Sequence, residues 1–219
     1  MPQHKSWDAG TSQVAAEVRE QSRQAVNSFK AQPGLLDEQY GIERSVVESG
    51  YRRAQLNELV QNAADAMLGL EGRLQVVLTD DTLYCANEGA PFKSSGVTTI
   101  MMAHRSSKRG KEIGRYGLGF KSVLEISNQP EIISRSGSFR WSEEITQRAL
   151  TAADVVHSAE HLPLLRVAEV FDPESEAKAD VVLAEMMEWA DTIIRLPLLE
   201  GVAEQVTRSM ATFRGEFVI

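Results

Sequence analysis

The feature that most constrains the fold is a change in hydrophobic period near residue 73. Before it, apolar residues recur every three to four positions and predict amphipathic helices at 12–31, 37–49 and 51–70. After it, two short segments rich in β-formers, 73–79 and 82–87, flank Asp80-Asp81 and predict a β-hairpin. Helices and strands are therefore segregated in blocks, which predicts an α+β fold rather than a strict βαβ alternation.

The rest of the chain continues this mixture. Helical patterns predict further helices near 97–103, 120–126, 142–161 and 200–213. Strand patterns predict a hairpin at 131–135 and 138–141 and single strands at 164–171 and 192–198. A chain of 219 residues is expected to form one large domain, or one domain with appendages. We assign a helical extension to residues 1–50 and the main domain to residues 51–219.

Composition excludes several classes of protein. Lys and Arg number 23 and Asp and Glu 31, and a net charge of −8 argues against a purely electrostatic nucleic-acid binder. The single cysteine, Cys85, cannot form an internal disulfide, so we expect a reducing, cytoplasmic location. No apolar run reaches the roughly 18 residues of a membrane span, so no membrane partner is expected. Residues 213–219 begin a strand pattern, and we expect this sequence to be the N-terminal part of a longer protein.

A first chemical pattern lies on the helix predicted at 51–70. Glu58, Asn62 and Asp65 share one helical face because they are spaced by four and then three residues. An Asn oxygen is a neutral ligand suited to Mg²⁺, and a Glu carboxylate can accept a proton from an attacking water. The same spacing also fits a plain amphipathic helix with a solvated face.

A second pattern follows the strand predicted at 82–87. The Asn87 side chain, at the strand end, could hydrogen-bond the edge of a base. Gly89, two residues later, permits a close backbone approach. An ordinary turn from strand to loop would also account for these residues.

A third pattern is a glycine-rich stretch directly before the helix predicted at 120–126. Its glycines expose backbone N–H groups next to a helix N-terminus, as phosphate-binding loops do, and they are Gly114, Gly117 and Gly119. It is not a Walker loop, because Phe120 separates the last glycine from Lys121-Ser122. It is not a dinucleotide fingerprint either, because the spacing is G-x-x-G-x-G. A glycine-rich hinge is the simpler alternative.

In this order, the three patterns resemble GHKL-type ATPases, the group of DNA gyrase B, MutL, histidine kinases and the ninety-kilodalton heat-shock chaperones. The segments GRYGLGFKSV and NEGAPF are most similar to the chaperone branch, and within it to the sacsin-type N-terminal ATP-binding domain. TIIRLPL, which begins at Thr192, also resembles a late strand of that group. The resemblance covers residues 51–130 and 189–200. It implies a two-layer α/β sandwich, the Bergerat fold, with a mixed, mostly antiparallel sheet covered by helices and a long ATP lid.

The resemblance also implies a role for each matching residue. Glu58 would be the general base, Asn62 the Mg²⁺ ligand, and residues 93–113 the ATP lid. The family usually has Asp where Asn87 stands, so an uncharged amide would face the adenine amino group here. The residues expected to contact ATP or ADP are Asn62, Asp65, Asn87, Gly89, Lys108, Gly114, Tyr116, Gly117, Leu118, Gly119, Phe120, Lys121, Ser122 and Thr192.

The resemblance implies an Mg²⁺-dependent module that binds ATP, hydrolyses it slowly and drives conformational change in a larger protein. Downstream domains of the same chain are expected to supply the cation at the γ-phosphate. Other domains are expected to reach a protein client or nucleic acid. Three alternatives remain open: a non-hydrolysing nucleotide-sensing or interaction domain, a histidine kinase catalytic domain, and a DNA-maintenance ATPase of the MutL or gyrase kind.

Overall fold

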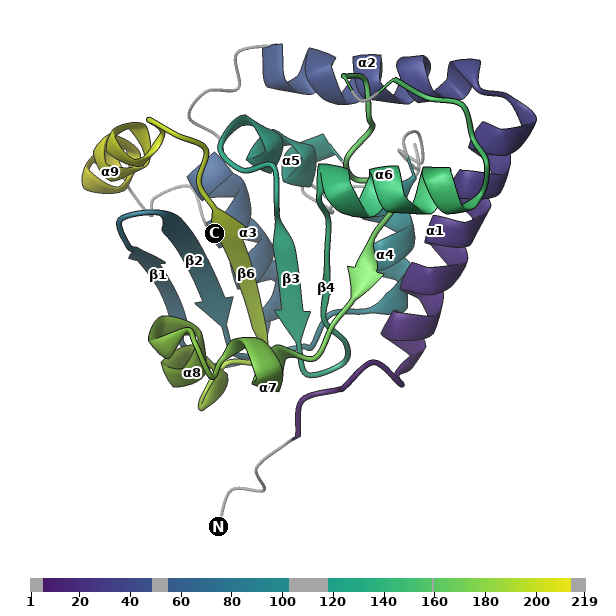
Figure 1. Cartoon of the computed structure of the whole chain (residues 1–219). Coiled ribbons are helices and arrows are strands. Elements are labelled where there is room, and N and C mark those ends of the chain that lie inside the picture. Colours follow the sequence, from purple (N-terminus) through teal and green to yellow (C-terminus); the bar gives the residue numbers. More distant parts are fainter. Residues whose placement is uncertain (1–5, 49–54, 103–117, 159, 214–219) are drawn as a thin grey trace.

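The computed structural model describes residues 6–48, 55–102, 118–158 and 160–213 (Figure 1). Its helices are α1 (Gln13–Ala31), α2 (Gly34–Glu48), α3 (Gln55–Ala66), α4 (Ser94–Met101), α5 (Leu118–Lys121), the 3₁₀ helix η1 (Ser122–Glu125), α6 (Glu143–Ala152), α7 (Pro173–Glu176), α8 (Val181–Met187) and α9 (Ala203–Thr212). Its strands are β1 (Leu74–Leu78), β2 (Thr82–Asn87), β3 (Glu131–Ser134), β4 (Phe139–Arg140), β5 (Glu169–Val170) and β6 (Thr192–Pro197). The α+β class is confirmed.

The strands form one sheet in the order β1-β2-β6-β3-β4-β5. The hairpins predicted around Asp80-Asp81 and between β3 and β4 are confirmed, and β6 inserts between β2 and β3 (Figure 1). Every pairing between the described strands is antiparallel, so the expectation of a mixed sheet was wrong for this part of the chain. The reason is that β6 runs opposite to both of the strands that flank it.

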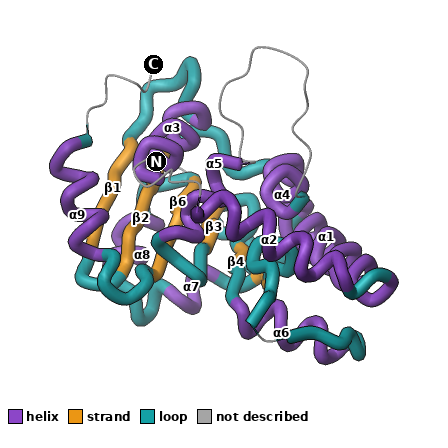
Figure 2. The backbone as a smooth tube through the Cα atoms, turned by 90° about the horizontal axis from the view of Figure 1, so that it is seen from above, coloured by secondary structure: helices purple, strands orange, loops and turns teal. Residues whose placement is uncertain are grey.

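Alternate residues of the central strands enter two different hydrophobic clusters. On one face, Leu83 and Cys85 of β2 and Ile194 of β6 pack with residues from α1, α3, α4 and α5. On the other face, Tyr84 and Ile193 pack with α8. Figure 2 shows α3, α4 and α5 on one side of the sheet and α7 and α8 on the other. This two-residue alternation is the pattern that sheet geometry requires of strands covered on both faces.

The first two helices share the core of the rest of the chain. Ser12 caps α1 by accepting the Ala15 N–H. Val14 and Val18 of α1 lie in the same cluster as the helix-facing residues of the sheet. Phe29 of α1 lies in a third cluster with residues of α2 and α6. Residues 13–48 therefore bury apolar surface against the sheet and its helices.

Two predicted elements are shorter than expected. The helix predicted at 142–161 ends at Ala152, just before Asp154 adopts a left-handed conformation with φ 56°. The strand predicted at 164–171 is reduced to Glu169–Val170. Its earlier backbone N–H groups find side-chain acceptors instead of a neighbouring strand: those of Leu164 and Leu165 donate to a buried carboxylate on α2, and that of Ala168 donates to Ser22.

Helices α7 and α8 were not predicted from the sequence. They are short, and each begins at an Asp cap, Asp172 and Asp180, which accepts a backbone N–H of the first turn. Arg195 of β6 ties them to the sheet, pairing with Asp180 at 3.0 Å and with Glu176 at 3.2 Å. Among all helices in the described part of the chain, none combines the length and apolar character needed to cross a membrane.

Candidate functional site

Three polar residues form a row across the face of the sheet that α3 covers. Asn87 ends β2, and its register partner on β6 is Thr192, whose partner on β3 is Ser134. All three are buried, and the Thr192 and Ser134 hydroxyls lie 3.1 Å apart. Strand pairing thus places at one level residues that are about fifty to a hundred positions apart in the chain.

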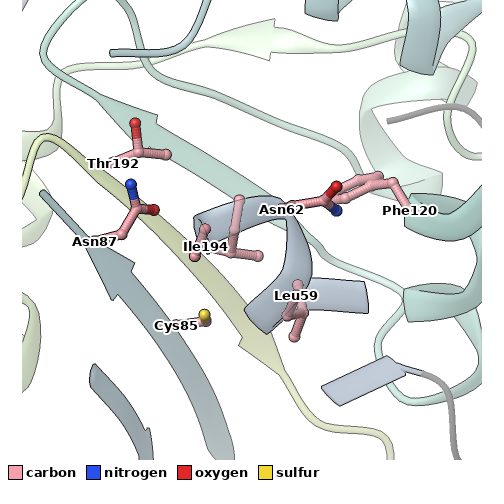
Figure 3. A pocket seen from close by; sticks show the side chains of 8 residues that line it. Leu59, Asn62, Cys85, Asn87, Phe120, Thr192 and Ile194 are labelled. Carbon is pink, nitrogen blue, oxygen red and sulfur yellow. The ribbon is translucent and has the colours of Figure 1, made fainter. Parts of the chain in front are cut away.

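A pocket opens between this row and helix α3 (Figure 3). Asn62 and Phe120 line it from the helix side, and Asn87 and Thr192 line it from the sheet. Its remaining walls are Leu59, Ala63, Cys85 and Ile194. Asn62 of the first pattern, Asn87 of the second and Phe120, which follows the last glycine of the third, therefore meet at one cavity, whereas Glu58, Asp65 and Gly119 do not line it. Its walls are mostly apolar with a few amide and hydroxyl groups, and its free volume of about 10 Å³ is close to that of a single water.

Asn62 is the residue of this pocket with an unmet hydrogen-bonding need. Its side chain is buried, with 6% of its surface exposed. The Oδ1 atom has no hydrogen-bond partner among the residues that the structure describes. A buried acceptor without a partner costs about 1–3 kcal/mol, so a ligand, cation or water that reaches Oδ1 would recover that cost.

Asn62 offers a single potential ligand for a cation, and the other helix-side walls of the pocket, Leu59, Ala63 and Phe120, are apolar. An amide oxygen is a suitable neutral ligand for Mg²⁺. Within the described ranges, no three His, Cys, Asp or Glu residues are grouped so as to hold a metal ion. A magnesium ion here would therefore take its other ligands from phosphate groups and water, which is the usual arrangement for this ion.

Glu58 lies one helical turn before Asn62 and reaches the helix that follows the glycine-rich stretch. A Cβ atom added to Gly119 would lie 2.0 Å from Glu58 Oε2, so the carboxylate packs directly on the α5 backbone. Burial raises the pKa of Glu58, and the negative charge of Asp65 raises it further. Asp65 is half-buried and accepts a hydrogen bond from Gln61 at 2.9 Å. A carboxylate with a raised pKa is a better proton acceptor.

Asn87 and Gly89 are held in place by the turn after β2. Asn87 Nδ2 donates to the Glu88 carbonyl at 2.8 Å, which fixes the orientation of the amide. Gly89 has φ 119°, and a Cβ there would lie 2.5 Å from the Ala66 carbonyl oxygen. The Ala90 N–H donates to that same oxygen. The close backbone approach expected at Gly89 is therefore made to the end of α3.

Asp191 is a residue of the site that the sequence analysis missed. Its backbone N–H donates to the Asn87 carbonyl, and its Oδ2 accepts from the Gly89 N–H at 3.1 Å. Its Oδ1 pairs with Arg135 at 3.2 Å. Asp191 thus joins the strand ends that carry Asn87 and Thr192. No spacing signal points to it, because Asn87 and Gly89 lie about one hundred residues away and Arg135 more than fifty.

The remaining predicted site residues lie on α5 and η1 or outside the described residues. Lys121 and Ser122 are buried but lie outside the lining of the pocket, and Ser122 donates to the Gly119 carbonyl within its own helix. Leu118 begins α5. Lys108, Gly114, Tyr116 and Gly117 lie outside the described residues, as do positions 103–113 of the expected lid. The described part of that segment, 93–102, contains α4.

Comparison with known proteins finds a local likeness. No family model matches the chain. The chain is 33% identical over 88 residues to "Protein NO VEIN" from Arabidopsis thaliana, a match that covers 38% of this chain and 3% of that protein. The chain therefore corresponds to a small fraction of the length of the curated relative that it matches.

Replacement of Gly89 tests the turn that holds Asn87. Gly89→Ala should lower the free energy of unfolding by more than about 1 kcal/mol, because its positive φ and the nearby Ala66 oxygen both oppose a Cβ. Gly69→Ala is the matched control, since Gly69 has φ 76° but no atom within 4 Å of an added Cβ. Urea denaturation measures both variants. An equal loss in the two would contradict the contact with α3.

Proposed function

We propose that this chain is an ATP-binding module of the GHKL type, with the Bergerat fold of the sacsin-like group, and that it hydrolyses ATP slowly with Mg²⁺. The observation that carries the proposal is the buried, unpartnered Asn62 oxygen, which lines the same pocket as Asn87 and Thr192. The helix pattern, the strand-end Asn and the residue after the last glycine were each ambiguous in the sequence. Their convergence on one cavity favours a shared ligand over three unrelated explanations.

The pocket offers different chemistry to the two ends of a nucleotide. Asn87 and Thr192 carry hydrogen-bonding groups beside the apolar side chains of Cys85 and Ile194, which suits the edge and face of an adenine ring. Asn62 would hold Mg²⁺, which supplies charge neutralisation to the phosphates when it is bound. Glu58 would accept the proton of the attacking water, and its raised pKa favours that role.

A non-hydrolysing nucleotide-sensing domain is the second candidate. The observation that favours it is Asn87, which stands where the resembled family usually has an Asp. This departure from the family changes a residue expected to bind the nucleotide, not one expected to hydrolyse it. Glu58, on the helix of Asn62, favours hydrolysis instead. The partners of the whole protein, including downstream domains that would add a cation at the γ-phosphate, belong to this proposal.

Replacement of Asn62 tests nucleotide binding. Asn62→Ala should weaken the affinity for Mg·ATP roughly tenfold or more, because it removes the proposed cation ligand. Asn57→Ala is the matched control, since Asn57 is exposed on the same helix. Titration calorimetry with Mg·ATP measures both variants. Unchanged affinity in Asn62→Ala would overturn the proposed function.

Replacement of Glu58 separates the two candidates. Glu58→Ala should still bind Mg·ATP, because Asn62 and the pocket walls remain, while hydrolysis falls by roughly 10²–10⁴-fold. The rate should be compared in the longest natural form of the protein, where any cation from downstream domains is present. Equal rates in variant and wild type would show that Glu58 is not the base. Binding without any hydrolysis by the wild type would favour the sensor.

The pH dependence of hydrolysis tests the environment of Glu58. Burial and the charge of Asp65 both raise the pKa of Glu58. As pH falls, Glu58 should therefore become protonated, and hydrolysis should decline, at a higher pH than for an ordinary Glu. Asp65→Asn removes one of these two causes and should shift the acid limb of the kcat profile to lower pH. A profile of initial rates from pH 4.5 to 8 measures the shift. If the acid limb does not move in Asp65→Asn, the charge of Asp65 does not raise the pKa of the base.

A further inference from the structure

A cluster of charged residues that includes Lys121 of α5 lies outside the lining of the pocket. Its carboxylate is Glu43 of α2, whose side chain is buried with 6% of its surface exposed. Glu43 accepts the backbone N–H groups of Leu164 and Leu165 at 2.6 and 3.0 Å. Burial raises the pKa of Glu43 to about 7, although the two N–H donors and the charges of Lys121 and Arg166 act in the opposite direction.

The first cation of this cluster belongs to α5. Lys121 is 3% exposed, and burial lowers its pKa while the charge of Glu43 raises it. Lys121 directly follows Phe120, which lines the pocket, and comes two residues after Gly119, which contacts Glu58. The short helix α5 therefore carries a pocket residue and a residue of the charged cluster side by side.

The second cation connects the cluster to α4. Arg166 Nη1 donates a hydrogen bond to the carbonyl oxygen of Met101, the last residue of α4. Burial lowers the pKa of Arg166, and the charge of Glu43 raises it. Glu43 also accepts the N–H groups just before Arg166. Glu43 is thus hydrogen-bonded to the segment that leads into Arg166, which bonds the end of α4, and α2 itself packs against α5 and η1.

Removal of the Glu43 charge would leave the buried Lys121 and the half-buried Arg166 without the negative charge that favours their charged forms. Each of them already lies where burial disfavours its charged form, and the charge of Arg166 further lowers the pKa of Lys121. Loss of one partner from a buried charged group is costly, because the other partner is left buried and uncompensated. The expected response is movement of the elements that carry the cations, α5 and the Arg166 segment, until water reaches the charges.

We propose that Glu43 is a positioning residue for the nucleotide site, because its carboxylate fixes the segment that is bonded to the end of α4, and because it lies on the helix that packs against α5, whose Phe120 lines the pocket. This inference rests on the proposed function for its ligand. It adds that α2, which contributes no side chain to the lining of the pocket, sets the nucleotide affinity through α5. Phe120, Met101 and the apolar residues of α4 lie in one hydrophobic cluster, so a displacement of α5 would also disturb α4.

The test combines a ligand-free measurement with a binding measurement on the 219-residue chain. Glu43→Gln keeps the size of the side chain and removes its charge, and Lys121→Met does the same for the cation. Glu38→Gln is the matched control, because Glu38 is exposed on α2. Hydrogen exchange followed by mass spectrometry reports on residues 98–101 and 118–125 without nucleotide. Calorimetry reports the Kd for Mg·ATP.

Glu43→Gln should speed exchange in both segments and weaken Mg·ATP binding, each by roughly tenfold, while Glu38→Gln changes neither. The double variant Glu43→Gln/Lys121→Met should weaken binding no more than Glu43→Gln alone, because the two charges act as one unit. If the two substitutions caused independent structural defects, their effects on the Kd for Mg·ATP would add. If Glu43→Gln does not fold, Lys121→Met carries the test, with faster exchange in 118–125 and weaker binding expected.

Three results would overturn the inference. They are unchanged exchange in both segments, faster exchange spread equally over β2 and β6, and unchanged affinity despite faster exchange. If the wild type itself does not bind Mg·ATP, the proposed function fails and the role of Glu43 at a nucleotide site fails with it. The exchange measurement still decides in that case whether Glu43 holds the two helices, so the two failures are distinguishable.

Discussion

The insertion of β6 between β2 and β3 is the constraint on which the rest of the structure depends. β1 and β2 form one hairpin and β3 and β4 form another, each from residues that are close in the sequence. The two hairpins become one sheet only when β6, from Thr192 onward, pairs with β2 and β3. That pairing creates the row of Asn87, Thr192 and Ser134 and the sheet side of the pocket. Asp191 reinforces it, since one residue joins the Asn87 carbonyl, the Gly89 N–H and Arg135. The site therefore depends on pairing between strands that are far apart in the chain.

The helix side of the site contains features that reduce stability. An unpartnered buried oxygen on Asn62 and a half-buried carboxylate on Glu58, raised in pKa by its surroundings, both carry a free-energy cost in the ligand-free protein. Costs of this kind concentrate at functional sites, where a ligand recovers them. Asn62 faces Asn87 and Thr192 across the pocket, whereas Glu58 packs against Gly119 of α5.

Charged groups are buried on both sides of the sheet, with different consequences. On the α8 side, Arg195 is held by Glu131, Glu176 and Asp180, three carboxylates around one cation. On the α3 side, Glu43 accepts two backbone N–H groups and is influenced by the charges of Lys121 and Arg166. The first cluster attaches short helices to the sheet. The second fixes the segment at Leu164 and Leu165 to α2, and its Lys121 directly follows Phe120 of the pocket wall.

The sequence by itself determined the α+β class, both hairpins and most of the helices. These features follow from local periodicity, turn residues and four-residue spacing, all of which act over a few positions. Glu58 and Asn62 were predicted on one face because helix geometry fixes that relation before any tertiary contact forms. Of the predicted face of α3, Asn62 lines the pocket, together with Leu59 and Ala63 rather than Glu58 and Asp65. The antiparallel sheet order, the loss of the strand predicted at 164–171 and the role of Asp191 were decided only by tertiary structure. The physical reason is that their hydrogen-bond partners, such as Glu43 for Leu164 and Gly89 for Asp191, lie about one hundred residues away, where no local pattern can specify them.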